Sequence, residues 1–172
     1  MIAQDVSPLL VVEDSEEDYT ALRWALRKVG VDRPLRRCAT GAELFDYLRR
    51  TGPYAAAASG GPADSGPGDA PTPALILLDL NLGVDDGRDV LARLKADAAL
   101  RRIPVVVWTT SAHPDDVAQC YAHGASGYAT KPVDVDQLVE SLRNVTRYWF
   151  GCVILPDAAP GAPARASSGA RG

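Results

Sequence analysis

The stretch ALILLD, residues 74–79, is the most hydrophobic segment of this 172-residue chain, and it ends abruptly in an acid. A short apolar run bounded in this way is typical of a strand buried on both faces of a parallel sheet. Residues 8–12 run in the same manner into an acidic pair, and residues 104–108 run into a threonine. The sequence therefore predicts three buried parallel strands, each followed by polar side chains.

Helical patterns alternate with these strands. Ser15 can cap a helix with an acidic first turn, in which apolar residues recur at helical spacing as far as Gly30. A weak second strand is expected at residues 35–39, followed by a helix that opens at the capping box 40–43. The remaining elements are helices that begin near Asp86, Pro114 and Asp134, and a short strand at residues 127–130. This alternation predicts an α/β fold, a doubly wound five-stranded parallel sheet with helices on both faces.

Glycine and proline are concentrated in two segments. Residues 52–73 contain five of each, and residues 156–172 contain three of each. We expect one domain at residues 1–150, with a flexible insertion at residues 52–73. Residues 151–172 are expected to form an apolar segment and then a disordered tail. The 25 residues that follow the last helix are too few for a second domain.

The composition argues against several classes of protein. The formal net charge is −4 and the isoelectric point is about 5.1, so no basic stripe indicates nucleic-acid binding. No apolar run approaches the roughly 18 residues that a membrane-spanning helix needs. The N-terminus lacks the basic region of a signal peptide, and a cytoplasmic location is expected. Three widely spaced cysteines favour neither a zinc site nor a disulfide framework.

Polar side chains follow four of the five expected strands. They are Glu13 and Asp14, then Asp79, Thr109 and Lys131. Because the carboxyl ends of parallel strands meet at one edge of the sheet, we expect these side chains to share a crevice. Crowded carboxylates repel one another unless a cation lies among them, and Mg²⁺ prefers such oxygen ligands. The combination predicts phosphoryl transfer to a carboxylate, with lysine and threonine holding the incoming group.

Four segments resemble the receiver domain of response regulators in two-component signalling. They are VVEDSEED at 11–18, LLDLNLGVDDG at 77–87, IPVVVWTTS at 103–111 and GASGYATKP at 124–132. The resemblance covers about residues 6–147 and implies a flavodoxin-like sheet with strand order 2-1-3-4-5. The motifs DSEED, LDLNL, GRDVL, VVVWTTS and YWFGCVILP are similar to those of stand-alone regulators that partner bacterial and cyanobacterial phytochromes.

The resemblance implies the chemistry of the expected site. Asp79 would accept a phosphoryl group from a sensor histidine kinase, such as a bacteriophytochrome. Glu13, Asp14 and Asp79 would hold Mg²⁺, together with the backbone carbonyl of Asn81. The regulator would catalyse only its own Mg²⁺-dependent phosphorylation and dephosphorylation, and would not be an enzyme with a separate substrate. The bond between Lys131 and Pro132 is expected to be cis, as is common in the family.

The resemblance also implies the switch. Thr109 is similar to the hydroxyl residue that moves toward the phosphoryl group, and Lys131 to the lysine that pairs with it. Tyr128 resembles the aromatic residue that turns inward when the threonine moves. Two positions depart from the family pattern. Gly83 stands where proline is usual, which implies a looser loop, and Asp85 stands where an apolar residue is usual.

Other functions remain as alternatives to a signalling switch. The protein could serve as a phosphate sink for its kinase. A phosphatase of the haloacid dehalogenase type would need an aspartate as general acid two residues after the nucleophile, and Asn81 stands there. A flavodoxin-like cofactor binder would need a phosphate-binding loop after the first strand. The acidic run 13–18 would repel a bare phosphate.

The output of a single receiver domain must be binding to another protein. An apolar cluster lies just beyond the last helix and comprises Trp149, Phe150, Val153, Ile154 and Leu155. These residues either pack on the protein's own core or form a surface for a homodimer or for kinase docking. The resemblance favours a homodimer.

Overall fold

The computed structural model describes residues 7–55 and 70–156. Five parallel strands form its central sheet in the order β2-β1-β3-β6-β7. The strands are β1 (Leu9–Val12), β2 (Leu35–Cys38), β3 (Leu75–Leu78), β6 (Val105–Thr109) and β7 (Gly127–Thr130). Numbered among themselves, these five strands have the order 2-1-3-4-5, so the expected flavodoxin-like fold is confirmed.

The three strands expected to be buried form the middle of the sheet. Every residue of β1, β3 and β6 is buried. Their register pairs Val12 of β1 with Leu78 of β3, and Leu78 with Val107 of β6. The residues that follow these strands therefore emerge side by side at one edge of the sheet, which is where the polar side chains are concentrated.

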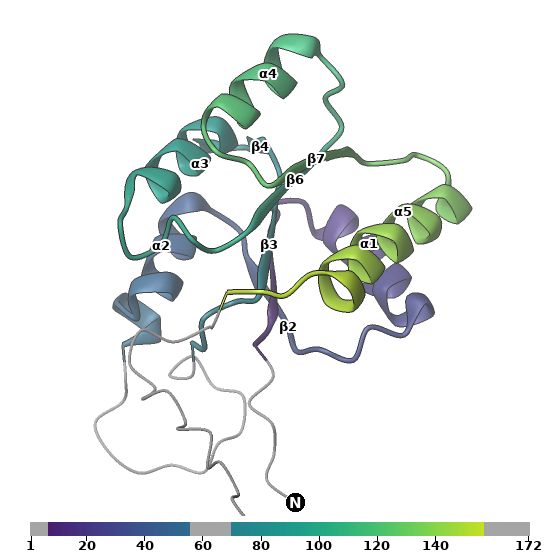
Figure 1. Cartoon of the computed structure of the whole chain (residues 1–172), viewed down its shortest axis with the longest axis horizontal. Coiled ribbons are helices and arrows are strands. Elements are labelled where there is room, and N and C mark those ends of the chain that lie inside the picture. The colour runs from purple at the N-terminus through teal and green to yellow at the C-terminus, as the bar shows by residue number, and fades with distance from the viewer. Residues whose placement is uncertain (1–6, 56–69, 157–172) are drawn as a thin grey trace, which may run out of the picture.

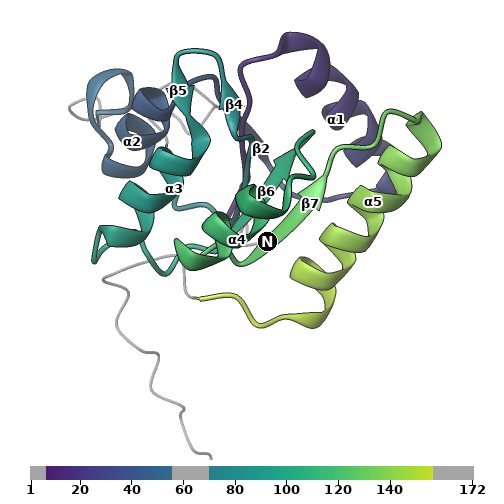
Figure 2. The same cartoon turned by 90° about the horizontal axis from the view of Figure 1, so that it is seen from above.

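Helices cover both faces of the sheet (Figures 1 and 2). Helices α1 (Glu16–Val29) and α5 (Val135–Arg147) lie on one face. Helices α2 (Gly41–Arg49), α3 (Gly87–Ala96) and α4 (Pro114–Ala122) lie on the other. Two hydrophobic clusters follow from this arrangement. One packs the side of the sheet under α1 and α5, and the other the side under α2, α3 and α4.

The expected helix starts are confirmed by their caps. The side chains of Ser15, Thr40, Asp86 and Asp134 each accept a hydrogen bond from a backbone N–H in the first turn of the helix that follows. These bonds satisfy N–H groups that have no partner within the helix. The polar residues after the strands thus set where α1, α2, α3 and α5 begin.

A small antiparallel hairpin was not expected from the sequence. It consists of β4 (Asn81–Leu82) and β5 (Asp85–Asp86), and it separates β3 from α3. Its turn contains Gly83 with φ of 63°, in the left-handed region. The carboxylate of Asp85 accepts a hydrogen bond of 2.7 Å from the backbone N–H of Gly41, at the start of α2. The unusual aspartate therefore ties this hairpin to a neighbouring helix.

The ends of the glycine- and proline-rich insertion are held against the domain. A short 3-10 helix, η1, occupies Gly52–Tyr54. On the other side of the insertion, Pro71 O accepts a hydrogen bond from the hydroxyl of Tyr47, and Ala70 O accepts one from Nε of Arg50. The expected flexibility concerns mainly residues 56–69, which lie outside the described residues. The expected disordered tail, at residues 157–172, does so as well.

The apolar cluster after α5 divides into two parts. The chain continues from α5 into a π-helical turn, η2 (Tyr148–Cys152). Trp149 and Phe150 pack partly buried against the hydrophobic cluster under α1 and α5. Ile154, in contrast, is 96% exposed.

In the described part of the chain, no helix has the length and apolar character needed to cross a membrane. The Lys131–Pro132 bond is trans, so the expectation of a cis bond is wrong.

Candidate functional site

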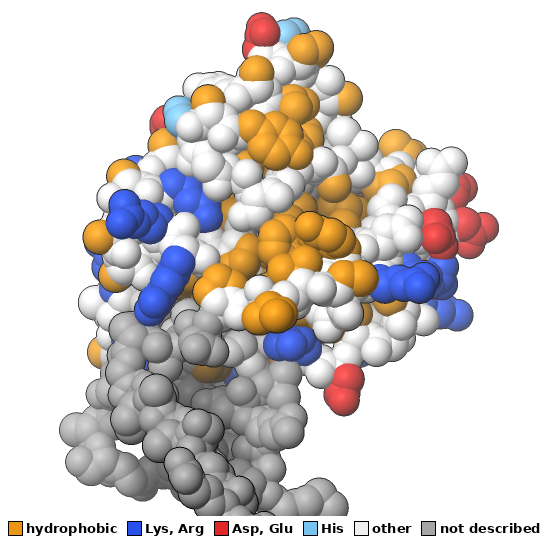
Figure 3. All heavy atoms as spheres, viewed as in Figure 1, with side chains coloured by type: hydrophobic (Ala, Val, Ile, Leu, Met, Phe, Trp, Pro, Cys, Tyr) orange, Lys and Arg blue, Asp and Glu red, His pale blue; other side chains and the backbone are white. Residues whose placement is uncertain are grey.

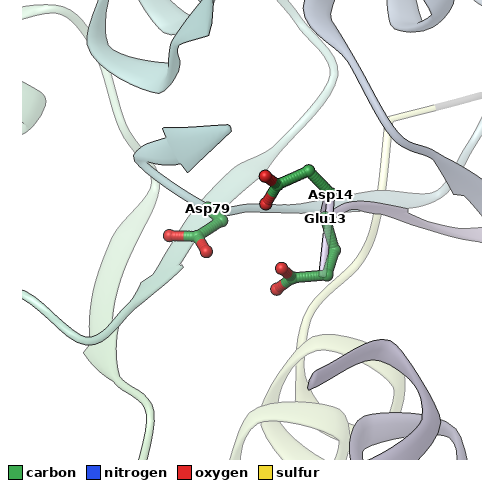
Figure 4. A group of neighbouring side chains, drawn as sticks. All are labelled: Glu13, Asp14 and Asp79. Atoms are coloured by element: carbon green, nitrogen blue, oxygen red, sulfur yellow. The ribbon is translucent and has the colours of Figure 1, made fainter. Parts of the chain in front are cut away.

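Three carboxylates meet at the carboxyl edge of the sheet. Glu13 and Asp14 follow β1, and Asp79 follows the adjacent strand β3. Glu13 is 2% exposed and Asp79 is 6% exposed, whereas Asp14 is exposed. Each residue offers an oxygen within 4.8 Å of an oxygen of the other two. Figure 4 shows the three side chains next to one another, with the carboxylates of Glu13 and Asp14 directed toward Asp79.

Lys131 enters the same space from the end of β7. Its ammonium Nζ lies 2.6 Å from Asp79 Oδ2, 2.5 Å from Glu13 Oε2 and 2.9 Å from Asp18 Oδ2. The backbone N–H of Lys131 donates a 2.7 Å hydrogen bond to Thr109 O, which continues the pairing of β7 with β6. The lysine is thus placed by the sheet and joins carboxylates from three segments of the chain.

The charges at this edge do not balance. Among the described residues, four carboxylates face one ammonium, so the local formal charge is negative. Burial raises the pKa of Glu13, and the hydrogen bond and charge of Lys131 only partly oppose this effect. Burial alone would lower the pKa of Lys131, but hydrogen bonds to Asp79, Glu13 and Asp18 outweigh it and raise that pKa.

The donor set fits a small hard cation. Mg²⁺ binds one or two carboxylates, keeps several water molecules and coordinates phosphoryl oxygens. Glu13, Asp14 and Asp79 offer oxygens from a buried side and an exposed side, so a bound cation would remain open to solvent. The excess negative charge left by Lys131 provides the electrostatic reason for such binding.

Backbone contacts fix Asp79 within this edge. The backbone N–H of Asn81 donates a 3.2 Å hydrogen bond to Asp79 Oδ1. Gly87, at the start of α3, lies so close to this segment that a Cβ there would stand 2.2 Å from the carbonyl oxygen of Asp79. The glycine therefore permits α3 to begin directly beside the backbone of Asp79.

The two expected switch residues both form hydrogen bonds with the loop after β6. Thr109 is fully buried, and its Oγ1 accepts a 3.4 Å hydrogen bond from the backbone N–H of Ser111. The hydroxyl of Tyr128 donates a 3.0 Å hydrogen bond to the carbonyl oxygen of Ser111. The structure therefore joins Thr109 and Tyr128 through one residue of the loop after β6. Within the described residues, neither side chain has a hydrogen bond to Asp79 or Lys131.

Three further residues make polar contacts around the site that were not predicted from the sequence. Asp18 belongs to the acidic run after β1, and its spacing of one helical turn from Ser15 could have indicated that it faces the same edge. Arg37 donates to the backbone of Glu13 from β2, and no local pattern indicates this contact. Asp116 accepts hydrogen bonds from Ser111 and Arg88, and these also depend on the tertiary fold.

Comparisons with known proteins agree with this geometry. A family model described as the response regulator receiver domain matches residues 9–143. Response regulator Rcp1 of Synechocystis sp. is 35% identical over 150 residues, which cover 87% of this chain and 93% of Rcp1.

Two crystal structures show the same arrangement of the chain. One is the phosphorylated cyanobacterial phytochrome response regulator RcpA, with a TM-score of 0.73 and 35% identity over 88% of this chain and 99% of that one. The other is the Mn²⁺-bound form of Rcp1, with the same TM-score and identity, over 87% of this chain and 99% of that one.

Proposed function

Because this chain belongs to the response regulator receiver family and is a receiver of two-component signalling, we propose that Asp79 is its phosphoacceptor. The observation that carries the proposal is the contact between Asp79 Oδ2 and Lys131 Nζ, beside Glu13 and Asp14. A carboxylate that is to accept a phosphoryl group needs neighbouring positive charge, since negative charge accumulates during the transfer.

The proposed transfer runs from a phosphohistidine of the kinase to Asp79. A carboxylate oxygen of Asp79 forms the new bond to phosphorus while the bond from phosphorus to the histidine nitrogen breaks. We assign Glu13, Asp14, Asp79 and the backbone carbonyl of Asn81 as the protein ligands of Mg²⁺. When bound, the ion would draw the carboxylate and phosphoryl oxygens together and offset their charge.

The ammonium of Lys131 would change its partner on phosphorylation. Its ammonium now contacts Asp79 Oδ2 and Glu13 Oε2. Once Asp79 carries the phosphoryl group, the nearest high concentration of negative charge is on the new phosphoryl oxygens. Lys131 is therefore proposed to pair with them. No separate substrate is part of this proposal, in which the domain promotes only its own phosphorylation and dephosphorylation.

The contact shared at Ser111 suggests how phosphorylation would change the surface. Thr109 now accepts a hydrogen bond from Ser111 N–H, and Tyr128 donates one to Ser111 O. We propose that Thr109 turns toward the phosphoryl group and gives up the first bond. The loop after β6 would then move, and Tyr128 would lose its fixed position. A chemical event at Asp79 would thereby shift a two-state equilibrium.

The relatives indicate the kind of kinase. RcpA is described as a cyanobacterial phytochrome response regulator, and it is similar to this chain over 88% of the chain. We therefore propose a sensor histidine kinase of the phytochrome class as the phosphodonor. The receiver would act in the cytoplasm, where such a donor presents its phosphohistidine.

A homodimer is proposed for the output surface. Strand β7 is at the edge of the sheet and is only partly covered. Hydrophobic side chains gather on this face, over β7 and the chain after α5 (Figure 3). Large apolar side chains exposed on α4 and after α5 include Tyr121, Tyr148 and Ile154. Covering them with a second copy would remove apolar area from water.

Phosphorylation by a small-molecule phosphodonor tests the site. In a protein carrying W24F and W149F, the remaining Trp108 is buried beside Thr109 and should report the site by its fluorescence. We expect a saturable Mg²⁺-dependent change that is absent in Asp79→Asn. The matched control Asp89→Asn, an exposed aspartate of α3, should respond like the parent. Phosphoryl label on Asp79→Asn would show that the acceptor is another residue.

Sedimentation tests the dimer. We expect a dimer at micromolar concentration, and a shift toward monomer when Ile154 is replaced by lysine. Val84 is 82% exposed on the hairpin near the carboxylates, so Val84→Lys is the matched control and should leave the association unchanged. A monomeric parent, with and without a phosphoryl mimic, would contradict the dimer.

A further inference from the structure

We propose that Arg37 is a positioning residue for the metal site. Its guanidinium would fix the backbone of the loop that carries Glu13 and Asp14, and would thereby hold the two carboxylates toward Asp79. This inference rests on the proposed function, because it concerns how the chain prepares the same Mg²⁺ site. Arg37 would touch neither the ion nor the phosphoryl group, and it would act through the loop alone.

The contacts of Arg37 converge on one loop. Its Nε donates a 2.9 Å hydrogen bond to Glu13 O, and its Nη2 donates a 3.1 Å hydrogen bond to Asp14 O. Its Nη1 forms an ion pair with the carboxylate of Glu16, in the first turn of α1. The guanidinium also stacks over the ring of Tyr19, 4.8 Å from the ring centre. One side chain therefore makes two contacts with the β1–α1 connection and two with the first turns of α1.

The place of Arg37 in the sheet explains why it can reach this loop. Strand β2 pairs with β1 in a register that puts Arg37 opposite Val11. The last backbone bond of this pairing runs from Glu13 N–H to Cys38 O, at 3.0 Å. Among the described residues, no backbone hydrogen bond runs from the sheet to residues 14 and 15. The hydrogen bonds from Arg37 to the next two carbonyls thus extend the support of the loop past the end of the strand pair.

Carbonyl orientation links these bonds to the carboxylates. The side chain of Glu13 meets Lys131, while its carbonyl oxygen meets Arg37. The two groups of Asp14 also have different partners: its carboxylate lies near that of Asp79, and its carbonyl oxygen accepts a hydrogen bond from Arg37. If the two carbonyls were free to rotate, the carboxylates would sample other directions, and part of the metal affinity would be spent on ordering them.

If Arg37 acted only through its charge, its removal would change the Mg²⁺ affinity in the opposite direction from a loss of positioning. Arg37 is positive and close to the acidic edge, so as a counter-charge alone it would repel Mg²⁺. Removing it would then strengthen binding. Lysine keeps the charge but lacks the planar fork that reaches two carbonyls and a carboxylate together. The pair Arg37→Ala and Arg37→Lys therefore separates position from charge.

The test measures the dissociation constant of Mg²⁺ from Trp108 fluorescence, without any phosphodonor, together with the thermal midpoint in metal-free buffer. We expect both Arg37→Ala and Arg37→Lys to weaken Mg²⁺ binding by roughly 10-fold to 100-fold, the usual range for residues that orient metal ligands. The matched control is Arg36→Ala, which removes the neighbouring charge. Among the described residues, the side chain of Arg36 makes no hydrogen bond or ion pair, and the Arg36→Ala variant should bind Mg²⁺ as the parent does.

Each outcome decides the inference. Parent-like or tighter Mg²⁺ binding in Arg37→Lys, at a temperature where it is folded, would overturn it, even if the thermal midpoint is lower. If Arg37→Ala does not fold, Arg37→Lys alone gives the answer. If the parent protein itself does not bind Mg²⁺, both the inference and the proposed metal ligands are wrong. If the parent binds Mg²⁺ but Asp79→Asn still takes up phosphoryl label, only the phosphoacceptor assignment is lost.

Discussion

The carboxylate of Asp14 lies against Gly83, so closely that a Cβ on residue 83 would stand 2.8 Å from Asp14 Oδ2. Gly83 also has φ of 63°, a conformation that proline cannot adopt because its ring fixes φ near −65°. The family's usual proline is therefore incompatible with this turn. In the structure, residue 83 lies in the turn of the β4–β5 hairpin, which meets the candidate metal site.

We expect Gly83→Ala to lower the free energy of unfolding by about 1–3 kcal/mol, because a non-glycine residue is strained at this φ. It should also weaken Mg²⁺ binding, since Asp14 must move away from the new methyl group. Chemical denaturation and a Mg²⁺ titration measure the two effects. Gly151→Ala is the control, because nothing lies within 4 Å of a Cβ there. Unchanged Mg²⁺ affinity in Gly83→Ala would mean that Asp14 is not a ligand.

Removal of the Lys131 side-chain charge should make the thermal stability of the protein depend more strongly on Mg²⁺. In Lys131→Met, Glu13 and Asp79 lose the only ammonium among the described residues that contacts both. Two largely buried carboxylates left without it repel each other and destabilise the fold. A divalent cation can replace the lost charge. We therefore expect a lower thermal midpoint without metal and a larger rise on adding Mg²⁺ than in the parent. A smaller rise would contradict the charge balance described above.

Asp116 should remain ionised to unusually low pH. The hydrogen bond from Ser111 and then those from Arg88 lower its pKa below the ordinary value of 3.8. The unfolded chain then binds this proton first, so the stabilising contribution is present above the ordinary pKa and is lost as the pH falls through the lowered one. Carboxyl carbon shifts in NMR spectra measure the titration. Ser111→Ala should move the pKa back toward 3.8, and an unchanged titration would refute the assignment.

Tyr128→Phe removes the hydroxyl that donates to Ser111 O and leaves the ring in place. We expect a loss of about 1 kcal/mol in the free energy of unfolding, the usual contribution of one hydrogen bond. If the proposed switch is right, the variant should also reach its full response at lower phosphodonor concentration, because one restraint on the resting state is gone. The exposed Tyr121 gives the control Tyr121→Phe. Denaturation and fluorescence titrations compare the two.

Much of the fold could be predicted because the signals are local. Apolar runs such as residues 74–78 and caps such as Ser15 and Asp134 depend on a few adjacent residues, and the structure has the elements where expected. The β4–β5 hairpin was missed because each of its strands has only two residues. Such short strands show no period, and their acids and glycine resemble an ordinary loop.

The site could be predicted only in part, because some of its contacts join segments that are far apart in the sequence. The carboxyl edge of a parallel sheet brings together Glu13, Asp14, Asp79 and Lys131 once the strand order is known. Whether Thr109 shares the crevice stays a prediction; its side chain is buried and accepts a hydrogen bond from its own loop, which no local sequence pattern indicates. The contact of Arg37 with Glu13 joins residues 24 positions apart and follows from strand register, which single-sequence patterns do not contain.

The hydrogen bonds from Tyr47 and Arg50 to the carbonyl oxygens of residues 71 and 70 have a practical consequence. They hold the carboxyl-terminal end of the glycine- and proline-rich segment just before the amino end of β3, whereas the carboxylates follow the other end of this strand or of its neighbour β1. We therefore expect that a change in the length of this segment leaves the carboxylates in place. For protein engineering, the segment that ends at residues 70 and 71 is an insertion site for a reporter domain, at a distance along the chain from the metal ligands.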